Sequence, residues 1–89
     1  MTMYMAYRRE QNAYGNLQPI LIGVYFDKKV AREHLTTLAM KFIEEENMGL
    51  KVKEEHETRI VLASVGSIVE LYLNPVDFDP TGSPWLADD

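Results

Sequence analysis

The residues of this chain that could do chemistry are two histidines, three serines and fourteen carboxylates, and there is no cysteine. His34 and His56 show neither the i,i+4 pair nor the HExxH spacing by which a helix holds zinc, so we expect His34 to border the core and His56 to be solvated. Ser64, Ser67 and Ser83 lie outside any Gly-x-Ser-x-Gly elbow, which favours ordinary turn or strand positions. There is also no phosphate-binding glycine loop. The sequence therefore predicts no enzyme, no cofactor and no metal site.

The carboxylates are segregated along the chain. Residues 44–57 hold six glutamates against Lys51 and Lys53, a net charge of −4, and residues 70–89 hold five acids and no base. Residues 28–41 carry +3. Carboxylates in exposed runs lack the burial that tunes a catalytic pKa, so the runs indicate a binding surface or a solvated one rather than an acid–base site.

These charges also invert the usual preference of a helix. Acids are favoured in the first turn and bases in the last, yet Lys28 and Lys29 open the predicted helix and Glu44–Glu46 close it. Such violations often accompany function. The alternatives are that the glutamates pair with Lys51 or Lys53, or are tolerated on a well-packed helix. The basic start could receive an anion at the free amides, or could simply be solvated.

The rest of the chain is organised around residues 18–27 and the helix that follows. Residues 20–26 are apolar except for Gly23, a run too short for a membrane span, which predicts a strand covered on both faces. Asp27 is placed to cap a helix. Apolar residues then recur at helical spacing from Lys28 to about Glu46, which predicts an amphipathic helix that packs on the strand.

Four further segments have the composition of strands. Residues 2–9 predict a first strand, and the turn-rich residues 11–16 close a hairpin onto the second. Residues 50–55 alternate as an outer strand does, 59–65 are apolar at both parities as an inner strand is, and 68–73 put Val69, Leu71 and Leu73 on one face. Asn74-Pro75 should end that strand. The fold class predicted is α+β, a five-stranded, mainly antiparallel sheet with one helix in the order ββαβββ.

The chain divides into a single domain over residues 1–75 and an acidic, proline-containing segment over 76–89. One helix covers only one sheet face, so the second face needs another cover. A second copy of the chain is the preferred cover, since symmetric dimers are the commonest assemblies. The other candidates are another protein and the C-terminal segment. That segment either straps its own sheet with Trp85 or docks on a partner.

Composition limits the partners and the compartment. The net charge is −5, which argues against direct contact with a phosphate backbone. No apolar run is long enough to span a membrane, and the N-terminal charges follow the apolar residues, the reverse of a signal peptide. We therefore predict a cytoplasmic protein with no direct nucleic-acid or membrane contact.

Residues 22–31, Ile-Gly-Val-Tyr-Phe-Asp-Lys-Lys-Val-Ala, followed by His34-Leu35, resemble a strand–helix junction common in small phage and bacterial proteins. In size, acidity and lack of catalytic motifs the chain resembles early host-takeover proteins of large Bacillus phages. That resemblance implies an inhibitor of a host DNA-associated protein, such as the histone-like nucleoid protein, in the host cytoplasm. No site residue is transferred by it.

Two functions are predicted from these features. The first is an acidic decoy that sequesters a basic, nucleic-acid-binding protein. Side chains on one face of a β-strand repeat at ~6.6–7 Å, close to the spacing of phosphates along one nucleic-acid strand, so carboxylates placed there can imitate a phosphate backbone. The alternative is a structural or accessory homo-oligomer without such a partner. The residues assigned to partner binding are Glu44, Glu45, Glu46, Glu54, Glu55, Glu57, Asp77, Asp79 and Trp85.

Overall fold

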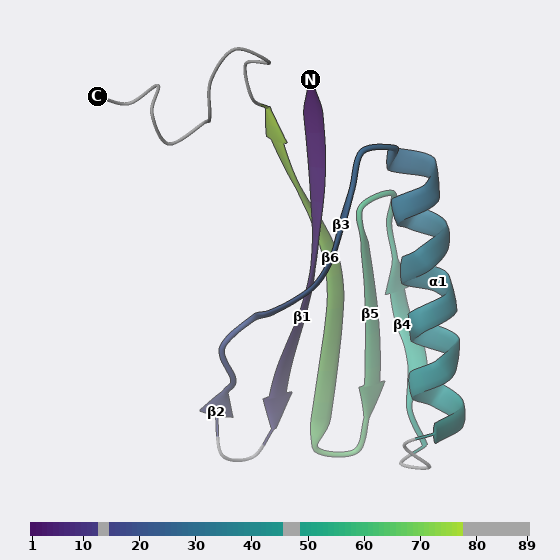
Figure 1. Ribbon diagram of the computed structural model, residues 1–89. Coiled ribbons are helices and arrows are strands. Elements are labelled where there is room, and N and C mark those ends of the chain that lie inside the picture. Colours follow the sequence, from purple (N-terminus) through teal and green to yellow (C-terminus); the bar gives the residue numbers. More distant parts are fainter. Residues whose placement is uncertain (13–14, 46–48, 78–89) are drawn as a thin grey trace.

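The computed structural model describes residues 1–12, 15–45 and 49–77, and these form one helix on one antiparallel sheet (Figure 1). The predicted α+β class is confirmed, with one short strand more than expected, in the order βββαβββ. The elements are β1 (Thr2–Asn12), β2 (Gly15–Asn16), β3 (Ile20–Tyr25), α1 (Lys28–Glu45), β4 (Lys51–Glu55), β5 (Arg59–Ser64) and β6 (Ser67–Asp77).

The sheet is built around β1 and β6, which pair antiparallel over their whole length from Thr2 opposite Asp77 to Asn12 opposite Ser67. The strand order is β2-β1-β6-β5-β4, and β3 pairs with β1 on the side that β2 also occupies. The sheet therefore has two edges. One is formed by β3 and the short β2, and the other by β4.

The helix begins where the sequence predicts. One carboxylate oxygen of Asp27 accepts the backbone N–H groups of Lys29 at 2.8 Å and Val30 at 3.1 Å, which satisfies two of the free amides at the helix start. α1 then runs antiparallel to β3, and its start lies beside the β4–β5 turn (Figure 1). The helix has no acid in its first turn and no base in its last.

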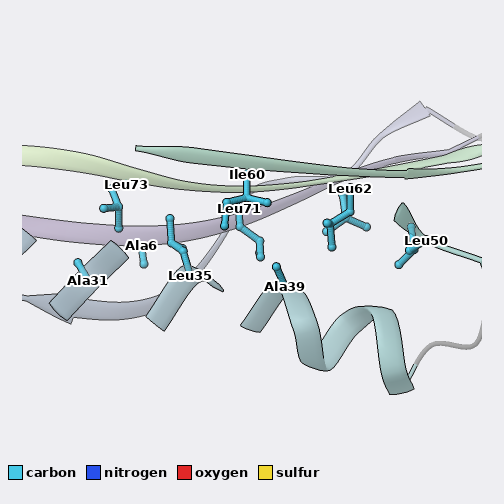
Figure 2. Packing of buried hydrophobic residues seen from close by; sticks show 10 residues of the cluster. Ala6, Ala31, Leu35, Ala39, Leu50, Ile60, Leu62, Leu71 and Leu73 are labelled. Atoms are coloured by element: carbon cyan, nitrogen blue, oxygen red, sulfur yellow. The ribbon is translucent and has the colours of Figure 1, made fainter. Parts of the chain in front are cut away.

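The core lies between α1 and the sheet face that it covers. Ala31, Leu35 and Ala39 point from the helix toward the sheet (Figure 2), and Leu35 is completely buried. Small alanines on either side of a leucine let the helix approach the strands closely. The cluster is completed by Leu50, just before β4, and by the sheet residues Ala6, Ile60, Leu62, Val69, Leu71 and Leu73.

The hairpin at the N-terminus differs in detail from the prediction. β1 continues to Asn12 instead of ending near residue 9, and β2 lies within the segment predicted as loop. The reason is that β6 offers β1 an eleven-residue partner, so pairing carries β1 past its apolar residues. Polar side chains are tolerated there because they are exposed to solvent.

The prediction that residues 20–26 form a strand covered on both faces is wrong. β3 pairs only with β1, and Ile20, Leu21 and Val24 are 51%, 48% and 44% exposed. β6 occupies the other side of β1, so the hairpin leaves β3 at the edge. The inner position predicted for residues 59–65 and the outer position predicted for 50–55 are both confirmed.

The prediction that Asn74-Pro75 ends the last strand is also wrong, because β6 continues to Asp77 with Pro75 opposite Tyr4. β5 pairs with β6 only as far as Tyr72, so beyond that point β6 has β1 as its one neighbour. Proline is compatible with such an edge position because its missing N–H can face the unpaired side.

Within the described residues, the helix is not long and apolar enough to cross a membrane.

Candidate functional site

The sheet face opposite α1 is a candidate binding surface, which we call the open face. Tyr7 and Tyr72 lie opposite each other on β1 and β6, and their rings stack with centroids 5.4 Å apart. Stacked aromatic pairs contribute more stability than the area they bury would give, and they hold the two rings in a fixed position on this face. In the described part of the chain no helix covers this face (Figure 1). The pairing registers place on it Met3, Met5, Tyr7, Arg9, Arg59, Val61, Ile68, Glu70 and Tyr72.

Glu70 joins two arginines at the centre of the open face. Its carboxylate accepts hydrogen bonds from Arg9 and, at 3.2 Å, from Nη1 of Arg59. The Glu70 side chain is 12% exposed, whereas the two arginines are 49% and 40% exposed. Glu54 extends the chain of charges, since its carboxylate lies 3.8 Å from Arg59 Nη2 and 3.5 Å from His56 Nε2.

A hollow of about 530 Å³ lies beside this network. The segment that joins β2 to β3 forms one wall, held by the N–H of Leu17, which donates to the carbonyl of Glu10 at 2.8 Å. The charged lining is balanced, because three bases meet three acids. These residues are Arg9, Lys53, Arg59, Glu10, Glu54 and Glu70. A balanced lining selects neither anions nor cations, and we assign no ligand to it.

Two glutamates predicted as a free acidic patch are instead paired with the start of α1. Glu55 accepts a hydrogen bond from Arg32 at 3.0 Å, and Glu57 accepts one from Lys28. The hydrogen bond between Lys28 and Glu57, aided by their opposite charges, raises the pKa of the lysine and lowers the pKa of the glutamate. Two bases near the start of the helix, Lys28 and Arg32, therefore have carboxylate partners at the end of β4 and in the turn that follows it.

The predicted acidic residues do not form one surface. Glu44 and Glu45 are exposed at the C-terminal end of α1, one helix length of ~27 Å from Glu55 and Glu57. Asp77 ends β6, where it accepts a hydrogen bond from Thr2. The other predicted residues, Glu46, Asp79 and Trp85, lie outside the described residues.

The described residues are nearly neutral as a group. The described residues hold nine bases and ten acids, so their net charge is −1 with neutral histidines, against −5 for the whole chain. The four remaining acids are Glu46, Asp79, Asp88 and Asp89. Five of the ten described acids form ion pairs with bases, so for half of them segregation along the sequence has become pairing in space. Glu33, Glu44 and Glu45 are exposed glutamates that form no ion pair with any described residue, and the last two lie together at the end of α1.

A tyrosine–histidine pair that the sequence did not reveal ties β3 to α1. The hydroxyl of Tyr25 lies 3.0 Å from Nδ1 of His34, and the rings meet edge to face with centroids 4.9 Å apart. The Tyr25 ring folds back over Gly23, where a Cβ atom would lie 2.6 Å from the hydroxyl oxygen. The glycine two residues before the tyrosine, on the same strand, was the available signal. His34 is exposed rather than part of the core.

No group of three or more histidine, cysteine or acidic side chains within the described ranges could hold a metal ion. The chain matches no protein-family model, no curated protein and no solved structure.

Proposed function

We propose that this protein is a non-catalytic accessory protein that works by self-association, through the parts of its sheet that α1 leaves open. The observation that carries the proposal is the β3 border of the open face, where Leu21 and Val24, 48% and 44% exposed, lie beside Tyr7 and Met5 of β1. Apolar side chains exposed together in this way mark interaction surfaces. Identical copies can cover such surfaces with closed symmetry.

Sedimentation equilibrium of the full chain tests this proposal. We expect a species of twice the 10.3 kDa mass of the chain at micromolar concentration. A single 10.3 kDa species across that range would refute self-association as the function. The proposal also places the protein in the cytoplasm and assigns it no catalytic activity.

A second candidate function is that of an acidic decoy for a basic, nucleic-acid-binding protein, such as the histone-like nucleoid protein of a bacterial host. The observation that favours it is the unpaired state of Glu44 and Glu45 among the described residues, at the helix end where the backbone dipole is also negative. The decoy surface would then be the end of α1. The glutamates of the β4–β5 turn would not belong to it, because they already have basic partners.

The two groups of glutamates provide a matched test of this second candidate. Histone-like nucleoid protein is titrated with the wild type, with Glu44–Glu46 changed to glutamine, and with Glu54, Glu55 and Glu57 changed to glutamine. Each variant removes three charges. If the candidate is right, only the first variant weakens binding, and the wild-type affinity falls as salt is added. Equal losses in both variants, or binding that is indifferent to salt, would contradict it.

A further inference from the structure

The outer edge of β3 is apolar and has no strand beside it. β3 pairs with β1 on one side only, so the backbone groups on its other side meet no strand within residues 1–12, 15–45 and 49–77. Residues 18–26 contain no charged side chain. Three of the six residues of β3, Ile20, Leu21 and Val24, are about half exposed, and Phe26 just beyond the strand is 65% exposed. Edges of this kind recruit another strand unless the protein protects them.

The opposite edge is protected in the usual way. Four of the five residues of β4 are charged and all five are exposed. Each of the two edge strands contains one register irregularity, so the edges differ in charge and not in regularity. Charged side chains keep a sheet edge solvated. The protein thus blocks pairing at β4 and leaves pairing at β3 possible.

We propose that β3 is the dimer edge of this protein, where it pairs antiparallel with β3 of a second copy to join the two sheets into one. This inference rests on the proposed self-association and names the surface that carries it. Pro19, which has no N–H to donate, limits the paired edge at the start of the strand. The extent of the new ladder is therefore that of β3 itself.

A second copy fits this edge for two physical reasons. First, β3 against β3 is related by a two-fold axis and closes after two copies, whereas β3 against β4 leaves a free edge at each end and continues into a filament. Second, an uncharged strand can lie beside its own copy in any register without placing like charges opposite each other.

The two-fold axis must be perpendicular to the sheet, because only then do the open faces of both copies lie on the same side of the joined sheet. Leu21 and Val24 lie on the open face, opposite Tyr7 and Met5 of β1. In the dimer they would meet their counterparts on that same face. Their exposure in the single chain, 48% and 44%, is then explained by the missing neighbour.

The absence of cysteine allows a clean test, because a single cysteine can carry a nitroxide label. Val24→Cys places the label on β3, and Val52→Cys places a matched label on β4, where Val52 is 52% exposed. Pairing through β3 brings the two β3 labels of a dimer within ~20 Å. The β4 labels are separated by nine interstrand spacings, or ~43 Å before twist.

A short distance at Val24 with a long one at Val52 supports the inference. A dimer with the opposite pattern, or with both distances long, overturns β3 pairing but leaves the proposed self-association standing. A protein that stays monomeric overturns both.

Charge placed on the edge provides an independent measurement. Leu21→Lys with Val24→Lys should raise the dissociation constant of the dimer ~10-fold or more, because like charges then face each other across the new ladder. Val52→Lys should leave it unchanged. Circular dichroism checks that each variant folds, and if the lysine variant does not fold, the label distances still decide. An unchanged dissociation constant in a folded lysine variant overturns the inference.

Discussion

Changing Glu70 to glutamine tests how the open face is held together. Glutamine keeps the shape of the side chain but removes the charge that attracts Arg9 and Arg59. Bonds to charged groups contribute ~1.5–3 kcal/mol when shielded, and exposed ion pairs contribute ~0–1 kcal/mol. Glu70 is 12% exposed while its partners are 49% and 40% exposed, so each bond lies toward the weaker end. We therefore expect the free energy of unfolding to fall by about 1–2 kcal/mol in total.

Urea denaturation measures this loss directly, and a thermal melt should show a decrease of ~4–16 °C, since each kcal/mol shifts the midpoint of a domain of this size by ~4–8 °C. Glu33→Gln is the matched control. Glu33 is an exposed glutamate on α1, and no described residue forms an ion pair with it. Its replacement should change the free energy of unfolding by less than ~0.5 kcal/mol.

A double-mutant cycle separates the bond itself from other effects of the substitution. If Glu70 and Arg59 act together, the loss in Glu70→Gln should shrink when Arg59 is already methionine, because the 3.2 Å bond between them is then absent. A loss no larger than that of Glu33→Gln, or a coupling of zero with Arg59, would refute the idea that this carboxylate organises the open face.

Three further predictions concern the folded domain. Asp27→Ala should cost ~1 kcal/mol of unfolding free energy and Asp27→Asn little, because asparagine can still cap α1. Leu35→Ala should cost ~2–5 kcal/mol, whereas Met40→Ala, at an exposed position of the same helix, should cost less than ~0.5 kcal/mol, and urea denaturation compares them. The pair of Lys28 and Glu57 should add stability that is lost as pH falls through the lowered pKa of the glutamate and as pH rises through the raised pKa of the lysine. Urea denaturation across pH should therefore give Glu57→Gln a lower free energy of unfolding than the wild type only between those two pKa values.

Local features of the fold were predictable because their causes lie close together in the sequence. Asp27 caps the helix through amides two and three residues away. Val69, Leu71 and Leu73 alternate with Glu70 and Tyr72, and this period of two assigned their faces correctly before any pairing was known. The turn between β5 and β6 also has a local cause, because Gly66 takes a φ of 85°, the left-handed conformation that other residues avoid.

The position of β3 could not be predicted because strand order is not a local property. An apolar run such as residues 20–26 has the same pattern of residues whether the strand lies between two other strands or at the edge of the sheet. Its place at the edge follows from the pairing of β1 with β6, whose paired residues are 55 to 75 positions apart in the sequence. The extra length of β1 and the survival of β6 through Pro75 have the same cause, since both depend on that partner.

The basic partners of the predicted acidic residues could not be predicted for a related reason. A run of glutamates shows how much charge a segment carries but not which bases fold against it. Glu55 meets Arg32 across 23 positions, and Glu57 meets Lys28 across 29. Pairing at that range gives two of the predicted acidic residues a basic partner, and it explains Lys28 at the helix start without any external anion.

The two candidate functions are linked by the symmetry of the β3 edge. A two-fold axis perpendicular to the sheet puts both helices on the same side of the joined sheet but reverses the direction of one of them. The acidic ends of α1 from the two copies, with Glu44 and Glu45, would therefore lie at opposite ends of that side. A dimer would then present two separated acidic ends on one nearly neutral body, an arrangement suited to a two-fold symmetric basic protein. In that case Leu21→Lys with Val24→Lys must weaken partner binding although it touches no carboxylate. If partner binding survives in the monomer, the acidic end of a single helix is sufficient, and self-association and decoy binding are separate properties of the chain.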